Sequence, residues 1–273
     1  MPKESYITYG HTFTDYPWHY HDAQKSEGMP QHEKYVNSWK YLILITLSKI
    51  ILNYDDSLPY DENSLNSLSK IEQFVIDSYG SKDPDLTQIF TPSRKLHLKP
   101  YFKIGIQAFE AGIAPEFTSM SELPKIFSEI NKDLIEHVIG SLNPDNNYFI
   151  AFDQLDLGFD PRSAEYQNRI IGLLLAARDL KKAAKERGKK FSAIIFLLDD
   201  IYDGLHFEDK NKITQNNLSL IEWDKGTSPN TLEKKWKGVS TYYCEKILLT
   251  DQIGKVFSMK PKKCPDIRLN MYI

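Results

Sequence analysis

Two apolar stretches of the sequence end on closely spaced aspartates. The stretch FIAFDQLD contains Asp153 and Asp156, and the stretch FSAIIFLLDD ends on Asp199 and Asp200. Carboxylates at the ends of buried strands suit Mg²⁺, which takes one or two of them together with water and phosphate oxygens. Aspartates also end strands for local reasons, because they bond to nearby backbone groups and cap following helices. These residues alone leave both a magnesium-nucleotide site and a structural role open.

The sequence offers weaker candidates for other chemistry. Four side chains near the amino terminus can ligate zinc. They are His19, His21 and Asp22 in the segment HYHD, and His32 further along the chain. They come without an HExxH motif or a cysteine pair, which favours a solvent-facing role over a metal site. Cys244 and Cys264 have no G-x-C context, and no G-x-S-x-G motif is present, so nucleophilic catalysis is not indicated.

The segments around the aspartates predict a βαβ unit. YFIAFD, at 148–153, is a short run of β-forming residues after the turn signal NPDNN. A helix is predicted from Ser163 to Arg187, and Gly188 ends it before a second strand at 191–200. The two strands of such a unit are parallel, and their carboxyl ends meet at one edge of the sheet. We therefore expect the aspartates of both strands to crowd one pocket there.

Apolar periodicity and turn residues predict the remaining elements. They are a strand at 6–14, helices at Gln31–Asn53, 64–79 and 121 to about 140, a strand at 218–223 and a helix from 228–230 to 248. The segment YPWHYHD is predicted to be a loop because Pro17 interrupts it. The tail VFSMKPKKCPDIRLNMYI has no period that assigns it. The predicted fold class is α/β, with helices flanking a parallel sheet.

The composition is that of a globular protein. The chain has 273 residues, 41% of them hydrophobic, and its net charge of −3 gives no bulk attraction to nucleic acid or to an anionic membrane. Its most apolar stretch, YLILITLSKIIL, is too short for a membrane span and contains Lys49. With two cysteines and no leader-like segment, we expect a cytoplasmic protein. The basic run at 181–190 is interpreted as the solvated end of a helix, with a partner surface left open.

An ATP site needs a phosphate cradle, and the sequence has none of the usual type. The motif G-x-x-x-x-G-K-[ST] supplies backbone N–H groups and a lysine to the phosphates. The Gly-Lys pairs are Gly188-Lys189 and Gly254-Lys255, and neither has the leading glycine or the following Ser or Thr. A Walker A motif is therefore absent from these 273 residues.

Five ordered blocks of the sequence fit one known family. They are HTFTDYPWHYHDAQ, EKYVNSWKYLILITLSKII, YFIAFDQLDLGFDP, FLLDDIYDGLHFEDKNKI and LSLIEWD, within roughly residues 6–256. These blocks resemble bacterial P-loop ATPases of the AAA+-like and STAND-like group, some of them encoded beside anti-phage defence genes. The resemblance implies a P-loop NTPase-like parallel sheet with a helical insertion between the N-terminal strand and the Walker B strand. It also implies ATP and Mg²⁺ as ligands, with hydrolysis driving a conformational change.

The resemblance also implies roles for individual residues. Asp153 takes the Walker B position that holds Mg²⁺, and Gln154 stands where many relatives have a second acid. Leu198 replaces an arginine expected on the sensor strand, which removes a cation from the γ-phosphate. The further candidates are two catalytic residues, Asp156, which would orient water, and Asp200, and two nucleotide-binding residues, Gln154 and Asp199.

The resemblance predicts how the chain is divided. Residues 1–257 would form a P-loop ATPase domain without its first strand and phosphate loop. A helix-rich insertion is expected at about 31–140 and the Walker B and sensor core at about 147–224. The tail at 258–273 departs from the family, and we expect a frameshift near Ser258, which the DNA of the gene would reveal.

Three hypotheses of function follow. A domain without a phosphate loop is expected to be a partial or inactive ATPase, with a gap where the missing strand should lie beside YFIAFD. The second hypothesis is a non-catalytic interaction module that pairs with a separate polypeptide supplying Walker A, or with a second copy of itself. The third is a metal-dependent hydrolase that uses His19, His21 and the aspartates.

Overall fold

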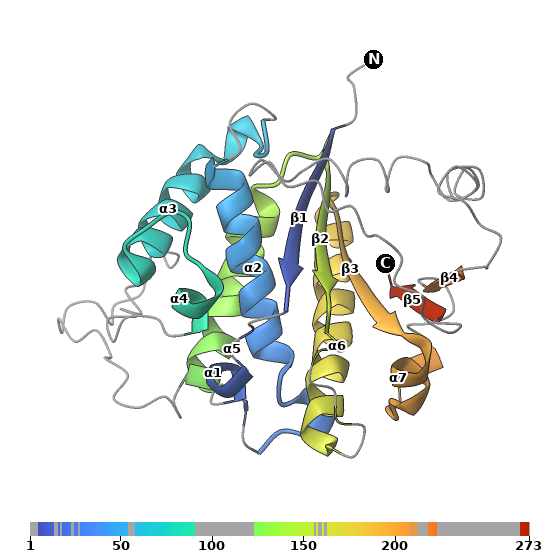
Figure 1. The fold of residues 1–273 in the computed structure, drawn as a ribbon. Coiled ribbons are helices and arrows are strands. Elements are labelled where there is room, and N and C mark those ends of the chain that lie inside the picture. Colours follow the sequence, from blue (N-terminus) through green and yellow to red (C-terminus); the bar gives the residue numbers. More distant parts are fainter. Residues whose placement is uncertain are drawn as a thin grey trace.

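The computed structural model has helices packed beside a five-stranded mixed sheet (Figure 1). Three neighbouring strands are parallel and position the aspartates: β1 (Tyr6–Thr12), β2 (Asn147–Asp153) and β3 (Lys190–Leu198). The predicted α/β class is confirmed. The structure describes residues 5–13, 16, 18–22, 25–26, 28–53, 58–90, 123–155, 157, 160, 163–208, 210–211, 218–222 and 268–272.

The predicted βαβ unit is confirmed. Helix α6 (Ala164–Glu186) connects β2 to β3, and the parallel register pairs Phe152 with Ile195. The chain reverses at Gly188, whose φ of +67° is a left-handed conformation that glycine adopts without strain. One face of both strands is fully buried, whereas the other face is only partly covered, because Ala151, Ser192 and Phe196 are half-buried.

Both edges of β2 are paired, which corrects one expectation. Strand β1 pairs along its whole length with one edge of β2, from Tyr6 opposite Asn147 to Thr12 opposite Asp153. Strand β3 pairs along the other edge. The prediction of a gap or loose packing beside YFIAFD was therefore wrong.

Helix α2 (Val36–Asn53) is the centre of the helical layer. Residues 41–51 are all buried. An apolar sequence of this kind suits a helix that is covered all round. The helix packs against α3 (Leu65–Tyr79), α5 (Leu123–Leu134) and α6. This packed layer is the scaffold against which the parallel strands lie.

The helices predicted at 31–53, 64–79 and 121–140 are confirmed, with altered ends. The short helix η1 (Gln31–Glu33) precedes α2, and η3 (Glu62–Ser64) precedes α3, which ends at Gly80 as predicted. The last turn before Gly140 is a π-helix, η6 (Ile135–Ile139), and α4 (Leu86–Phe90) was not predicted. One prediction was wrong, because YPWHYHD is not a simple loop but contains helix α1 (Trp18–Asp22).

The carboxyl-terminal half differs from the prediction in two places. The second strand ends at Leu198, and Asp199 begins the short helix α7 (Asp199–Gly204) instead of ending the strand. The tail that had no assignable period contains β5 (Arg268–Tyr272), which pairs with β3 and with β4 (Leu218–Glu222). The helix predicted after 228 lies outside the described residues, and the proposed domain boundaries stay predictions.

Candidate functional site

The carboxyl ends of β1, β2 and β3 lie at one edge of the sheet (Figure 1). Asp153 is the last residue of the central strand and is half-buried, and the exposed Thr12 ends β1 directly opposite it. Ligands of open α/β sheets bind in the crevice outside this edge. The candidate site is therefore the surroundings of Asp153.

A sharp backbone turn follows Asp153. Gln154 has a φ of +62°, which is uncommon outside glycine, and its N–H donates to Asp153 Oδ1 at 2.8 Å. The turn lies between two fully buried side chains, Phe152 and Leu155. Asp156 lies outside the described residues, and its predicted role in orienting water stays a prediction.

Asp199 and Asp200 come after the position that would be opposite Asp153 on the neighbouring strand. The register of β2 on β3 places Phe196 level with Asp153, so Asp199 comes three residues later. Asp200 Oδ1 accepts from the Ile201 N–H at 2.9 Å, a bond within the first turn of α7. In the part of the chain that the structure describes, no three His, Cys, Asp or Glu side chains gather as a metal cluster would require. The expected crowding of the aspartates is thus not seen among these residues.

The residues at this edge suit magnesium better than they suit the phosphates of a nucleotide. Asp153 and Thr12 offer oxygen donors, which Mg²⁺ prefers, and one carboxylate is enough when water and phosphate complete the coordination. The phosphates themselves need backbone N–H groups and a lysine, and the sequence has no motif of that kind. The fit is therefore to the metal half of such a site.

A second polar cluster, the Asp22–Arg169 cluster, lies at the start of α6 and was not predicted. Arg169 Nε donates to Asp22 Oδ1 at 2.7 Å, and its Nη2 contacts the other carboxylate oxygen, so the pair is bidentate. The Tyr35 hydroxyl is within hydrogen-bonding reach of both Asp22 and Glu165. The guanidinium also lies over the ring of Trp18, with 5.0 Å between its central carbon and the ring centroid.

The Asp22–Arg169 cluster fixes α1 against the first turns of α6. Arg169 has a carboxylate and an aromatic ring as partners, so the structure assigns it to this contact and not to an anion. Burial raises the pKa of Glu165, but the Tyr35 hydrogen bond and the charge of Lys25 outweigh it and hold that pKa below its usual value. The available sequence signal was one arginine four residues after Glu165, directly before the apolar run that begins at Ile170.

His21 is buried and has no nitrogen left for a metal. Its Nε2 lies 2.7 Å from Ser38 Oγ and its Nδ1 3.0 Å from the Tyr16 hydroxyl. Ser38 donates its own proton to the Tyr35 carbonyl, so His21 Nε2 is the donor and Nδ1 accepts from Tyr16. Burial, and secondarily the charge of Arg169, lowers the pKa of His21 well below its usual value. The ring is therefore neutral and structural.

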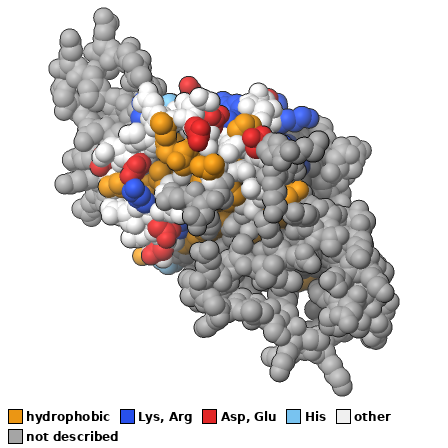
Figure 2. Space-filling model, turned by 90° about the horizontal axis from the view of Figure 1, so that it is seen from above, with side chains coloured by type: hydrophobic (Ala, Val, Ile, Leu, Met, Phe, Trp, Pro, Cys, Tyr) orange, Lys and Arg blue, Asp and Glu red, His pale blue; other side chains and the backbone are white. Residues whose placement is uncertain are grey.

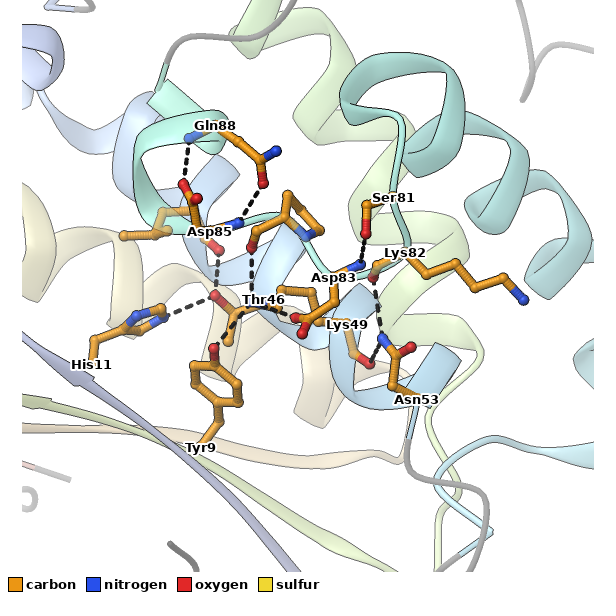
Figure 3. A network of polar contacts seen from close by, with 12 residues as sticks. Tyr9, His11, Thr46, Lys49, Asn53, Ser81, Lys82, Asp83, Asp85 and Gln88 are labelled. Carbon is orange, nitrogen blue, oxygen red and sulfur yellow. Dashed lines mark hydrogen bonds and ion pairs between the residues drawn. The ribbon is translucent and has the colours of Figure 1, made fainter. Parts of the chain in front are cut away.

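Figure 3 shows a third polar network, the Lys49 network, between β1, α2 and the segment 81–88. Lys49 Nζ donates to the Tyr9 hydroxyl at 3.0 Å and to the Pro84 carbonyl at 2.8 Å, and it pairs with Asp83 at 2.8 Å. Burial alone would lower the pKa of Lys49, but these partners outweigh it and raise the pKa. All three N–H donors of the ammonium are in use, so we interpret this lysine as a tether and not as a phosphate ligand.

His11 belongs to the same network (Figure 3). Its Nε2 lies 2.9 Å from Thr46 Oγ1, and Thr46 donates to the Leu42 carbonyl, so His11 is the donor. Burial and the nearby charge of Lys49 lower the pKa of His11 to about 3. This histidine is therefore neutral at any physiological pH, which suits a fixed hydrogen bond and not proton transfer.

Figure 2 shows the face of the molecule seen from the amino ends of β1 and β2, opposite the candidate site. Apolar side chains gather there among acidic and basic ones. The two most exposed large apolar side chains among those described are Leu58, at 52%, and Leu65, at 60%. The Leu58 carbonyl accepts from Asn146, which directly precedes β2, so Leu58 lies at the opposite end of the strand from Asp153.

Comparison with models of protein families, with curated proteins and with solved structures gives no match for this chain. Within the described part, no helix combines the length and apolar character that a membrane span needs. The site is thus defined by its own geometry: three parallel strands ending at a common edge, with a half-buried aspartate closing the central strand.

Proposed function

We propose that this chain supplies the magnesium-binding half of an ATPase site of the P-loop type. The observation that supports the proposal most strongly is the place of Asp153 at the carboxyl end of the central strand of three parallel strands. That is where a Walker B carboxylate would hold Mg²⁺ against nucleotide phosphates. The sequence blocks that resemble P-loop ATPases include this same strand.

The phosphate-binding half would come from a companion polypeptide that supplies the Walker A loop. Without backbone N–H groups and a lysine around the phosphates, most of the binding energy for ATP is missing from these 273 residues. Asp153 would hold the ion, Gln154 and Asp199 would lie beside the nucleotide, and Asp156 and Asp200 would be the candidates for orienting water. In this proposal the chain alone is a partial site and not an active enzyme.

The alternative of a metal-dependent hydrolase has less support. Both ring nitrogens of His21 are engaged inside the core, so this residue cannot join His19 as a ligand. A non-catalytic interaction module fits the same fold, and the two readings differ in whether Asp153 binds a divalent ion. That difference can be measured directly.

The first experiment measures ATP turnover by the purified chain with Mg²⁺ present. We expect no phosphate release above the background without protein, because the phosphate cradle is missing. Magnesium-dependent turnover that disappears in Asp153→Ala would overturn the proposal of a half-site.

The second experiment uses Mn²⁺ as a paramagnetic substitute for Mg²⁺. We expect weak binding, with a dissociation constant on the order of millimolar for one carboxylate in water, and selective broadening of the amide signals of Thr12 and Gln154. Asp153→Asn should abolish that broadening. Asp145→Asn is the matched control, because Asp145 is exposed and precedes the same strand at its other end. Broadening that survives in Asp153→Asn would sink the assignment of the metal to this residue.

A further inference from the structure

Strand β5 is inserted between two strands that run the same way. It is antiparallel to β3 on one side and to β4 on the other, so β3 and β4 are parallel to each other. Strands β1, β2 and β3 are also mutually parallel, which leaves β5 as the one described strand that opposes the rest. The backbone thus forms a slot between β3 and β4, and residues 268–272 fill it.

The connection to this strand is unusually long for an antiparallel pair. Glu222, the last residue of β4, is opposite Arg268, the first residue of β5, so the 45 residues 223–267 leave and return at the same point of the sheet. Antiparallel neighbours are commonly joined by loops of two to five residues, which fix both strands to one chain. A connection of 45 residues does not hold β5 beside β4 in the way that a short hairpin loop would.

The pairing itself can be reproduced by another molecule of the same chain. A strand with neighbours on both sides is held by backbone hydrogen bonds along both edges, and the register depends on the segment and not on which chain supplies it. Among the described elements, α7, which follows β3 directly, also contacts β5. An incoming strand from a second copy would therefore meet the same three elements.

We propose that residues 268–272 are exchanged between two copies of this chain, so that each copy fills the slot between β3 and β4 of the other. Exchange of an identical element creates a closed dimer without any new type of contact. The proposal does not depend on ATP or Mg²⁺ and stands or falls separately from the proposed function.

The experiment uses two full-length chains that each contain one cysteine. Ser219 and Met271 are directly opposite in the β4–β5 register, and opposite residues of antiparallel strands have Cα atoms about 4.5–5.5 Å apart, within the range of a disulfide. One chain contains Ser219→Cys, the other Met271→Cys with an affinity tag, and Cys244 and Cys264 are serine in both. After mixing and mild oxidation, we expect a covalent heterodimer whose yield rises with protein concentration.

The matched control adds Asn270→Pro to the tagged chain. Proline has no N–H, and residue 270 pairs with Leu197 on one side and Leu220 on the other. The substitution should therefore weaken the pairing of residues 268–272 with β3 and β4 of the other copy. We expect at least tenfold less heterodimer from this mixture.

A single chain with both Ser219→Cys and Met271→Cys completes the test and does not depend on the proline variant. A disulfide between chains supports the exchange. A disulfide that forms only within one chain, with no more heterodimer in the mixture than in the control, overturns it. Absence of any disulfide also overturns it, because the β4–β5 pair would then not exist.

Discussion

The polar groups around α2 and those at the carboxyl edge of the sheet are held in different ways. His11, His21 and Lys49 are buried, and each is bonded to groups far away in the sequence. Asp153 and Asp200 are more exposed, and their hydrogen bonds include one to the N–H of the very next residue. The first set is fixed by tertiary packing, whereas the second set is positioned by where two strands end.

This difference separates the scaffold from the candidate site. A buried polar group that loses its partner costs the free energy of desolvation, so the groups around α2 must stay as they are for the chain to fold. A half-buried carboxylate at a strand end is closer to solvent, so we expect a ligand there to disturb the core less. We therefore expect substitutions around α2 to affect stability and substitutions at Asp153 to affect ligand binding.

The largest expected effect is a loss of stability in acid. The pKa of His11 is about 3 in the folded chain, and that of His21 is also well below its usual value of 6.5. Below pH 6.5 the unfolded chain binds protons at these positions that the folded chain does not, so stability is full above that pH and falls as the pH drops towards the folded pKa. For His11 the free energy of unfolding should fall by about 2 kcal/mol between pH 6.5 and 4.5. Urea unfolding across this range measures it.

The acid prediction has a matched pair of variants. His11→Gln keeps an N–H donor for Thr46 but has no group that titrates in this range. The free energy of unfolding of this variant should therefore fall less steeply with decreasing pH than that of the wild type, by a slope that corresponds to one bound proton. His206→Gln, which changes an exposed histidine, is the matched control. An unchanged slope in His11→Gln would contradict a neutral, buried His11.

The next effect tests the packing of α6 against α2. A Cβ on Gly172 would lie 2.8 Å from the Cβ of Tyr35 and 3.2 Å from its carbonyl carbon, too close for real contacts. Gly172→Ala should therefore lower the free energy of unfolding by about 1–3 kcal/mol. Gly140→Ala is the control, because this helical glycine has open space around it and alanine there should be neutral or stabilising by up to about 1 kcal/mol. Equal effects of the two substitutions would show that the α2–α6 contact is not tight.

The smallest effect is expected at the site itself. Asp153→Asn keeps the oxygen that accepts from the Gln154 N–H and should change the free energy of unfolding by less than about 0.5 kcal/mol. Thr46→Val changes the side chain just as little in volume, but it removes the oxygen that accepts from His11 inside the core. It should lower the free energy of unfolding by about 1–3 kcal/mol. Similar losses in both variants, measured by urea unfolding at pH 7, would break the distinction between scaffold and site.

Elements whose signal is local could be predicted from the sequence. The strands β2 and β3 are short runs rich in apolar, β-forming residues, and α6 has a cap at Ser163 and a stop at Gly188. Their parallel pairing could also be predicted, because two strands joined by a helix in one sheet are almost always parallel. The position of Asp153 at the carboxyl edge of the sheet could be predicted for the same reason.

Elements that depend on distant partners could not be predicted in the same way. Helix α1 is five residues long and is held by Asp22 on Arg169, 147 positions away. Strand β5 has a weak alternation, RLNMY, which is too short to stand out without β3 and β4 beside it. The level of Asp199 relative to Asp153 is a matter of strand register, which no local pattern encodes.

The sequence by itself determined the α/β class, the order strand–helix–strand and the aspartate that closes the central strand, because hydrophobic period and turn residues are local properties. Only the tertiary structure decided which polar groups are sealed inside, how the two strands are staggered and which segment fills the slot between β3 and β4. Those features depend on contacts between residues far apart in the chain, and their energies exist only once the chain is folded.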